Sequence, residues 1–333
     1  MMERNSDIDF VITWVDGADP QWLEEFRKWR GDDRTENTSP IRYRDWDHLR
    51  YWFRGVERFA PWVSRIHFVT WGHLPEWLDT THPKLHVTNH RDYIPQEYLP
   101  TFSSRTIELN IHRIEGLSER FVYFNDDMFL CRPLPEERFF RQGLPCDMAR
   151  LSLLSFSSIS HAILNMIEIM NRRYRRAEVM RRHPGKWFAP CYGAANLLKT
   201  LDLAVWNTIP ALTDTHMPQP YLKETFDKMW HEEREILDAT CRSRVRDNAG
   251  VNHWLMRYEQ LLSGRFSPVS FRDTKLDTLT EQRIDTIASY VAAGRYAMIC
   301  LNDSPLIADF EGVKRKLCGA LESLLPEKSS YEH

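Results

Sequence analysis

Two groups of Asn and Asp directly follow short apolar runs, and both could bind a divalent cation. Asn125-Asp126-Asp127 follow the run RFVYF, and Asn302-Asp303 follow the run YAMICL. Carboxylates at the carboxyl end of a strand are hard ligands that suit Mg²⁺, which commonly bridges diphosphate oxygens. Asn and Asp also favour turns, so a plain turn is the alternative at each place. Two such groups make a composite metal site more plausible than either alone.

A carboxylate and an imidazole that could move protons lie upstream of the first group. Glu108 and His112 are four residues apart in a segment expected to be helical, which would place them on one helix face. Beside a metal, such a pair could do general acid–base work. An ordinary surface pair is the alternative. Asn110 and Arg113 lie elsewhere on the same expected helix.

Candidate phosphate-binding residues occur in the second half of the chain. His216 lies in THMPQP, and Arg242, Arg244 and Arg246 alternate in CRSRVRDN. Arginine suits phosphate because its planar fork donates two hydrogen bonds at once. Alternating arginines are common on solvated segments, so we expect one or two of them to matter.

A strongly basic segment, NRRYRRAEVMRR, covers residues 171–182 and contains six arginines. It could meet an anionic acceptor or a membrane surface. A solvated helix is the alternative, and the pattern alone leaves both interpretations open.

The elements that would position these residues alternate along the first half of the chain. Strands are expected at 8–15, 65–71, 84–89 and 120–124, with helices at 20–30, 47–59 and 104–114. This alternation predicts an α/β fold with a mainly parallel, Rossmann-like sheet. Ligands of such sheets bind beyond the carboxyl ends of the strands.

The second half of the chain has a different pattern. Residues 151–263 predict helices, at 160–182 and 221–240, and no convincing strand. A late strand at 296–301 is expected to return to the sheet, and residues 327–333 to fray. We therefore expect an α/β core that binds nucleotide-sugar and metal at 1–150, a helical insertion with substrate and phosphate contacts at 151–265, and a return to the core with a C-terminal helix at 266–333.

Composition and missing motifs exclude several classes. The 333 residues contain 44 Lys plus Arg and 47 Asp plus Glu, a net charge of −3, which argues against a dedicated nucleic-acid binder. The first residues lack the pattern of a secretory signal, and the six cysteines have no metal-finger spacing, so we expect reduced thiols in a cytoplasmic protein. No Walker A, GxGxxG or GxSxG motif occurs. The residues by themselves indicate a metal-dependent α/β enzyme acting on a phosphorylated or nucleotide-linked substrate.

Four blocks of the sequence resemble the Stealth family of hexose-1-phosphate transferases. The first is DFVITWVDGADP at 9–20, and the second begins at RYRD (42–45), continues through LRYWFRGVERFAPWV, FVTWG, PEWL and HRD, and ends in IELNIHRIEGLSERFVYFNDDMFL. The third is HMP at 216–218, continuing to Arg246-Asp247, and the fourth is LNDS at 301–304. The third departs from the family, because RVRDNAG stands where an FRS-like stretch with a following acidic pair is usual. The assignment of Arg246 is therefore weaker than that of Asp127.

The resemblance implies a sheet similar to that of nucleotide-sugar transferases and a specific reaction. A sugar 1-phosphate would pass from a UDP-sugar to a hydroxyl of a saccharide acceptor, free or lipid-linked, with release of UMP and formation of a phosphodiester. The implied cofactor is Mg²⁺, with Mn²⁺ as the alternative. The implied setting is bacterial capsule or cell-surface polysaccharide synthesis, in the cytoplasm or peripherally at the inner face of the membrane.

The resemblance also implies roles for individual residues. The catalytic set is Glu108, Asp127, His216 and Arg246. The metal set is Asp127 and Asp303, with Asn302 or Asp126 as helpers. The substrate-binding set comprises Trp14, Asp16 and Gly17 at the first strand's end, Arg44 and Asp45 nearby, and Asn110, His112 and Arg113.

Two other functions stay open at this stage. A conventional metal-dependent glycosyltransferase would look alike locally but would release UDP. A non-catalytic carbohydrate-binding protein would use its tryptophans, 12 in all, as stacking platforms.

Overall fold

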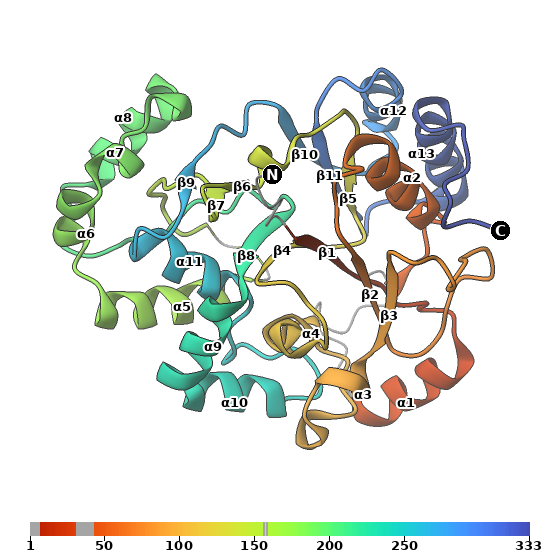
Figure 1. Cartoon of the computed structure of the whole chain (residues 1–333), viewed down its shortest axis with the longest axis horizontal. Coiled ribbons are helices and arrows are strands. Elements are labelled where there is room, and N and C mark those ends of the chain that lie inside the picture. The colour runs from red at the N-terminus through yellow and green to blue at the C-terminus, as the bar shows by residue number, and fades with distance from the viewer. Residues whose placement is uncertain (1–6, 31–42, 156, 158) are drawn as a thin grey trace, which may run out of the picture.

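The computed structural model describes residues 7–30, 43–155, 157 and 159–333, so Arg42 of the second block lies outside the described residues. At its centre is a five-stranded sheet of order β3-β2-β1-β4-β8 (Figure 1). The first four strands run parallel to their neighbours, and β8 runs antiparallel to β4. The predicted α/β class with a mainly parallel sheet is confirmed.

The strands of the described residues form three sheets. The central sheet contains β1 (Ile8–Thr13), β2 (Ile66–Thr70), β3 (Leu85–Asn89), β4 (Arg120–Phe124) and β8 (Gln219–Leu222). A second sheet contains β10 (Thr274–Thr278), β11 (Met298–Asn302) and β5 (Met128–Leu130), and a third contains β6 (Phe140–Arg141), β7 (Leu144–Asp147) and β9 (Ser267–Pro268).

Helices cover both faces of the central sheet. Those of the first half are α1 (Pro20–Arg30), α2 (Leu49–Phe59), α3 (His90–Tyr93) and α4 (Ser104–Leu109). Those of the second half are α5 (Ser160–Arg173), α6 (Arg176–Arg182), α7 (Pro184–Trp187), α8 (Ala194–Leu203), α9 (Lys223–Glu232), α10 (Arg234–Arg242), α11 (Trp254–Leu262), α12 (Ile284–Ala292) and α13 (Phe310–Leu324). Short 3₁₀ turns are η3 (Gln96–Tyr98), η4 (Ile111–Arg113), η5 (Glu136–Arg138) and η6 (Pro190–Tyr192).

Alternation along the strands divides the core into two halves. In β1, Phe10 and Ile12 pack into the core shared with α2, α12 and α13, whereas Val11 between them packs into the core shared with α5, α9, α10 and α11. Successive side chains of a strand point to opposite faces, and both faces here are covered. The continuous apolar run Phe10–Ile12 in β1, rather than an alternating one, follows from this double burial.

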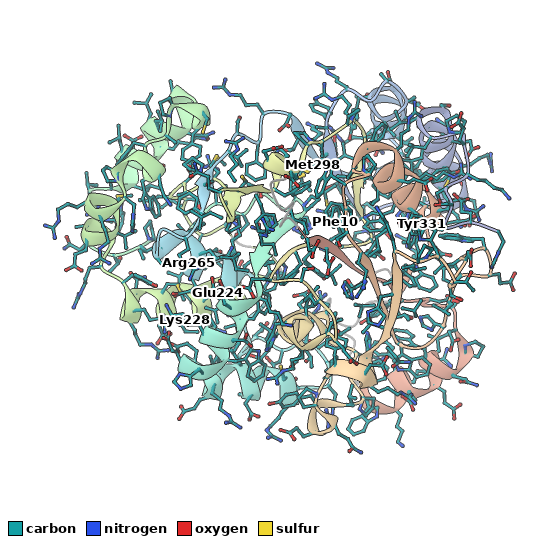
Figure 2. All side chains as sticks on the ribbon, in the orientation of Figure 1. Phe10, Glu224, Lys228, Arg265, Met298 and Tyr331 are labelled. Atoms are coloured by element: carbon teal, nitrogen blue, oxygen red, sulfur yellow. The ribbon has the colours of Figure 1, made fainter. Side chains whose placement is uncertain are left out.

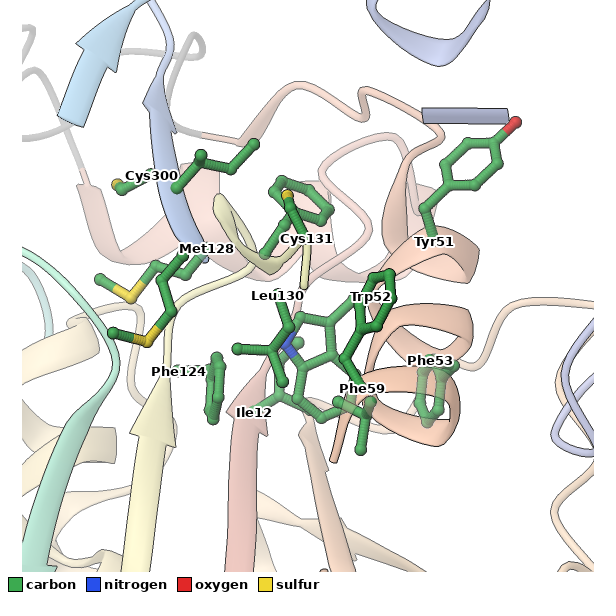
Figure 3. Packing of buried hydrophobic residues seen from close by; sticks show 14 of the residues in the cluster. Ile12, Tyr51, Trp52, Phe53, Phe59, Phe124, Met128, Leu130, Cys131 and Cys300 are labelled. Carbon is green, nitrogen blue, oxygen red and sulfur yellow. The ribbon is translucent and has the colours of Figure 1, made fainter. Parts of the chain in front are cut away.

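The helix α2 packs closely against the sheet and β5 (Figure 3). The ring of Trp52 meets that of Phe124 edge-on, with centroids 5.3 Å apart. A Cβ at Gly55 would lie 2.9 Å from the carbonyl oxygen of Leu130, so only glycine allows this close approach. The packing fixes β5, which begins directly after Asp127.

The expected helix at 104–114 is interrupted, which corrects the prediction. The α-helix ends at Leu109, and a 3₁₀ turn follows from Ile111. Asn110 Nδ2 donates to the carbonyl oxygen of Thr106 at 2.8 Å and so competes with the backbone hydrogen bonds that would continue the helix.

The prediction of no strand in residues 151–263 is wrong. Gln219–Leu222 forms β8, at the edge of the central sheet. Pro220 lies within this strand, and an edge strand tolerates proline because one side needs no N–H donor. The two long helices expected here are each divided, at Tyr174 and at Glu233.

The late strand exists, but it does not join the central sheet. β11 pairs with β10 in parallel and with β5 in antiparallel orientation. The Leu301 N–H donates to the carbonyl oxygen of Asp127 at 2.9 Å. Because β5 starts where the first acidic group ends, this pairing brings both Asn–Asp groups to one place.

The C-terminal residues are packed rather than frayed. The ring of Tyr331, labelled in Figure 2, is buried against Phe53 with centroids 5.3 Å apart. Arg54 donates to both carboxylate oxygens of Glu332, at 2.8 and 2.9 Å. This ion pair and the ring contact hold the chain end against α2.

The six cysteines are free, and four of them are buried, as expected. Among the described helices, none is both long and apolar enough to cross a membrane.

Candidate active site

A cavity of about 920 Å³ opens at the carboxyl ends of β1 and β4. The residues predicted from the sequence that line it are Trp14, Arg44, Glu108, Asp126, Asp127, His216, Arg246, Asn302 and Asp303. The four residues of the predicted catalytic set therefore lie around one cavity, although 138 positions separate the first from the last. Its position is the one expected for a ligand site of a parallel sheet.

Asp126 and Asp127 form an acidic pair whose negative charge, once ionised, the protein does little to compensate. Burial, together with the neighbouring Asp127, raises the pKa of Asp126 to about 7. Burial raises the pKa of Asp127 to about 6, and its buried Oδ1 has no hydrogen-bond partner among the described residues. An acidic pair with an unpaired oxygen fits a bound cation, because a cation would replace the lost hydration.

Ligand atoms of Asp127, His216 and Cys300 lie within 4.8 Å of one another. Burial raises the pKa of the Cys300 thiol well above its ordinary value, which makes it the poorest ligand of the three for a hard cation. The donors left are carboxylate oxygen and imidazole nitrogen. Such a set suits Mn²⁺ or Mg²⁺, with nitrogen favouring the former.

Asp303 lies at the cavity but is already fully engaged. Arg44 donates to its two oxygens, from Nε at 3.0 Å and from Nη2 at 2.7 Å, and Trp46 Nε1 donates to Oδ2 at 3.1 Å. The backbone N–H of Ser304 donates to Oδ1 at 2.6 Å. With four donors on two oxygens, Asp303 is held as a structural partner of Arg44 in this structure, which does not favour its predicted role as a metal ligand.

Gly17, Asp16 and Asp45 do not line the cavity. A Cβ at Gly17 would lie 1.9 Å from the carbonyl oxygen of Tyr43, so glycine is needed where two segments touch. Asp16 accepts from the N–H of Ala18, and Asp45 from that of Asp47, each at 2.8 Å. These residues shape the turns that carry Trp14 and Arg44.

Asn110, His112 and Arg113 lie away from the cavity as well. The His112 ring stacks on Phe226, with centroids 5.5 Å apart, and Arg113 lies over the ring of Trp230. His112 therefore does not share a face with Glu108, because the helix ends between them. His112 and Arg113 thus pack η4 against α9, whereas Asn110 donates to Cys241 of α10, and the geometry gives no support to the predicted substrate contacts of the three residues.

Glu108 is the centre of a polar cluster at one wall of the cavity. Burial raises its pKa, while Arg246, Ser104 and Arg105 oppose the rise. Arg246 reaches this wall because its Nη2 donates to the hydroxyl of Ser104 and because the Phe102 N–H donates to the Arg244 carbonyl at 2.8 Å.

His253 completes this cluster and was not predicted from the sequence. Its Nε2 lies 4.0 Å from Glu108 Oε2, and its Nδ1 lies 2.7 Å from the hydroxyl of Tyr221. Burial, with His216 and Arg257 nearby, lowers the pKa of His253 to about 3, so the ring is neutral. A neutral imidazole beside a buried carboxyl group can relay a proton.

His216 is presented by a constrained loop. Its backbone φ is 48°, in the left-handed region that side chains rarely adopt. Two residues earlier, Asp214 accepts from Arg257 Nη1 at 3.0 Å and from the hydroxyl of Tyr258. Burial lowers the pKa of His216, which keeps a nitrogen lone pair available.

Arg257 joins this loop to the strands. Its guanidinium group is buried, with 1% of the residue exposed, and donates to both oxygens of Asp147 at 2.7 and 3.0 Å. Gln219 of β8 donates to the same carboxylate at 3.1 Å. The network thus ties α11, β7 and β8 to the loop that ends in His216.

The residues missed by sequence reasoning share one property. Asp147, Asp214, His253 and Arg257 stand singly in the chain, outside any spaced motif, and each acquires its partners only through folding.

Family comparison matches two parts of the chain. Residues 6–34 match the family described as Stealth protein CR1, conserved region 1, and residues 42–146 match Stealth protein CR2, conserved region 2. These regions correspond to the first two of the four blocks quoted above.

Similar proteins cover nearly the full chain. The capsular polysaccharide phosphotransferase WcwK of Streptococcus pneumoniae is 40% identical, over 98% of this chain and 99% of its own. The exopolysaccharide phosphotransferase cps2G of Lactiplantibacillus plantarum is 36% identical, over 98% and 96%. The receptor polysaccharide phosphotransferase WefC of Streptococcus oralis is 38% identical, over 98% and 99%.

Two solved structures are weakly similar to the chain. Mouse xyloside xylosyltransferase 1 has 9% identity and a TM-score of 0.36, over 89% of this chain and 97% of that chain. The galactosyltransferase LgtC has 11% identity and a TM-score of 0.34, over 97% and 98%. Likeness at this level carries no argument about the site.

Proposed function

The chain belongs to the Stealth family of polysaccharide phosphotransferases, and from this premise we propose that it transfers a hexose 1-phosphate from a UDP-sugar to a saccharide hydroxyl. It is a transferase of capsule or related polysaccharide synthesis, rather than a non-catalytic binding protein. The observation that carries the proposal is that Glu108 and Asp127 of the second block line one cavity with His216 and Arg246 of the third.

In the proposed reaction the acceptor oxygen attacks the phosphorus that bears the sugar. The bond from that phosphorus to the bridging oxygen breaks, and the oxygen leaves with UMP. The bond between the sugar and its phosphate stays intact, so the anomeric configuration is retained. The acceptor proton must pass to a base, and the product is a phosphodiester.

Glu108 is our candidate for that base, because a buried carboxylate with a raised pKa accepts a proton more readily than a solvated one. His253, 4.0 Å away, would orient it or carry the proton onward. His216 is the alternative base, and in that role it would leave the cation to the carboxylates. Arg246, next to Glu108, would donate to the transferred phosphoryl group.

Asp127, with Asp126 and His216 beside it, would hold Mg²⁺ or Mn²⁺. Such a cation would neutralise diphosphate charge and stabilise the leaving UMP. Trp14, at the end of β1, and Arg44 would contact the nucleotide. The acceptor is an oligo- or polysaccharide, free or lipid-linked, and the enzyme would work in the cytoplasm at the inner membrane face, with no nucleic-acid partner.

The identity of the released nucleotide tests the reaction. The enzyme is incubated with a panel of UDP-sugars, Mg²⁺ or Mn²⁺ and an oligosaccharide acceptor, and nucleotides are separated by anion exchange. We expect UMP in equal amount to a phosphodiester seen by ³¹P NMR. Release of UDP instead would establish conventional glycosyl transfer and refute the proposal.

A variant pair tests the placement of the metal. Asp127→Asn should abolish nearly all turnover while the protein stays folded. The matched control is Asp285→Asn, whose carboxylate is exposed on α12 and pairs only with Lys316 among the described residues. Near-normal turnover of Asp127→Asn would show that the metal lies elsewhere.

A further inference from the structure

We propose that α8 and the turn after it form a docking face for an anionic membrane. The α8 face consists of Leu198, Leu201, Val205 and Trp206, which are 59%, 51%, 79% and 56% exposed. Leu198 and Leu201 are three residues apart and Val205 follows four later, so the three share one side of the helix and its continuation. Large apolar side chains gathered in this way usually mark an interaction surface.

The segment that contains this apolar face is rich in basic residues. Residues 171–206 contain eight Lys or Arg and two Asp or Glu, in a chain whose net charge is −3. Arg176 Nε donates to the carbonyl oxygen of Trp206 at 2.6 Å, which fastens the start of α6 beside the end of α8. Figure 1 shows α6, α7 and α8 together along one edge of the molecule.

Four of these cations are exposed and make no ion pair with any described residue. They are Arg175, Arg181, Arg182 and Lys199. Arg173, by contrast, is paired with Glu233 and Glu259 and belongs to the fold. Apolar side chains that enter the interface, flanked by cations that meet lipid phosphates, are the combination that binds anionic membrane surfaces.

A second copy of the chain is a poorer occupant. In a two-fold interface the same patch meets itself, so the basic residues of each copy would face those of the other. An anionic lipid surface instead complements the patch. We therefore commit to the membrane as the partner.

The side of α8 opposite this apolar face contacts the wall of the cavity. Arg150, which lines the cavity, donates from Nη1 to Asn196 Oδ1 of α8 at 3.0 Å and from Nε to Thr213 at 2.8 Å. The exposed Leu153 and Leu154 line the same cavity. Docking through α8 would hold the cavity close to the lipid surface. The idea that this closeness serves a lipid-linked acceptor rests on the proposed function. The proposal that α8 docks on a membrane does not.

Vesicle binding tests the docking face without donor or acceptor, so failure of the proposed reaction would not affect the result. Binding is measured by flotation with phosphatidylglycerol–phosphatidylcholine vesicles and with pure phosphatidylcholine vesicles. We expect binding to the anionic vesicles only, weakened at about 0.5 M NaCl because salt screens the charge contribution.

Two variants separate the contributions of the face. Leu198→Gln with Leu201→Gln and Trp206→Gln should lower the partition coefficient by about tenfold or more. Replacing Arg175, Arg181, Arg182 and Lys199 by Gln should remove the preference for anionic lipid. The control, Trp29→Gln with Leu74→Gln, changes comparably exposed apolar residues elsewhere and should bind like the wild type.

Three results would overturn the proposal. They are no binding to anionic vesicles, equal binding to both vesicle types, and unchanged binding by the α8 variant while circular dichroism shows it folded. A concentration-dependent dimer in analytical ultracentrifugation, lost in the α8 variant, would assign the face to self-association instead.

Discussion

Replacing Arg257 by alanine should destabilise the protein and disturb the loop that carries His216. The guanidinium group donates to both oxygens of Asp147 and to Asp214. Its removal leaves Asp147, which is 1% exposed, with only two of its four donors, Gln219 and the Met148 N–H. A buried carboxylate that loses its counter-charge is strongly disfavoured.

The size of the effect follows from these contacts. Breaking a buried ion pair by removing one partner costs about 3–5 kcal/mol, and we take about 4 kcal/mol because Asp214 keeps Tyr258. At about 2.1 cal/mol/K per residue, the unfolding entropy of this chain is about 0.7 kcal/mol/K. The Tm should therefore fall by about 6 °C. Arg257→Lys keeps the charge but not the two-pronged geometry, and should lower Tm by about half as much.

Thermal unfolding followed by circular dichroism measures this change, and UMP release measures the effect on His216. In Arg257→Ala we expect kcat to fall by about tenfold, because a misplaced catalytic loop costs rate even when the chemistry is intact. KM for the donor should change less, since Arg257 does not line the cavity.

A double-mutant cycle separates lost packing from lost charge. Arg257→Met fills the volume, and Asp147→Asn removes the stranded charge, so the double variant should be more stable than Arg257→Met alone. If the two effects simply add, or if Arg257→Ala lowers Tm by less than about 2 °C, the reasoning about this network is refuted.

Three further predictions concern the cavity. The pKa values of Asp126 and Asp127 are raised to about 7 and about 6, so ionisation of the pair destabilises the metal-free protein as pH rises through this range. Mn²⁺ should therefore raise Tm more at pH 8 than at pH 5.5, and its apparent affinity should fall by at least about tenfold from pH 8 to pH 5. Equal Tm shifts at the two pH values would argue against this pair as ligands. Glu108→Gln should lower kcat by a factor of about 10²–10⁴ without lowering Tm, and Glu76→Gln, at an exposed position, is the control. A kcat of Glu108→Gln within about threefold of the wild-type value would exclude Glu108 as the base. Gly17→Ala should displace Tyr43 and the Arg44–Asp303 pair and lower Tm by about 2–4 °C. The control Gly319→Ala, where an added Cβ would have no neighbour within 4 Å, should leave Tm unchanged or raise it. Similar Tm values for the two variants would contradict the close approach at Gly17.

Local pattern was sufficient for much of the fold. The strands of the first 124 residues and the helices at Pro20–Arg30 and Leu49–Phe59 appear within two residues of the predicted bounds. Failures occurred where a distant partner decided the outcome. β8 forms only because β4 offers it an edge, and the late strand pairs with β5 rather than with the central sheet.

The candidate site shows the same division. The acidic residues after β4, Glu108, His216 and Arg246 could be named because they lie in recognisable blocks, and the structure places all of them at the cavity. The sequence blocks therefore indicated which residues could take part in the chemistry. The blocks carried no information about which of these residues already have ion-pair or hydrogen-bond partners within the protein.

That pairing depends on contacts between residues far apart in sequence. Arg44 engages Asp303 across 259 positions, Arg257 engages Asp147 across 110, and His253 approaches Glu108 across 145. The sequence by itself determined the fold class, the family and the acidic and basic residues available for catalysis, because strand and helix periods and motif spacing are local properties. Only the tertiary structure decided which carboxylates remain unpaired for a cation and which histidine stands beside the base, since both follow from burial and from neighbours that the chain brings together by folding.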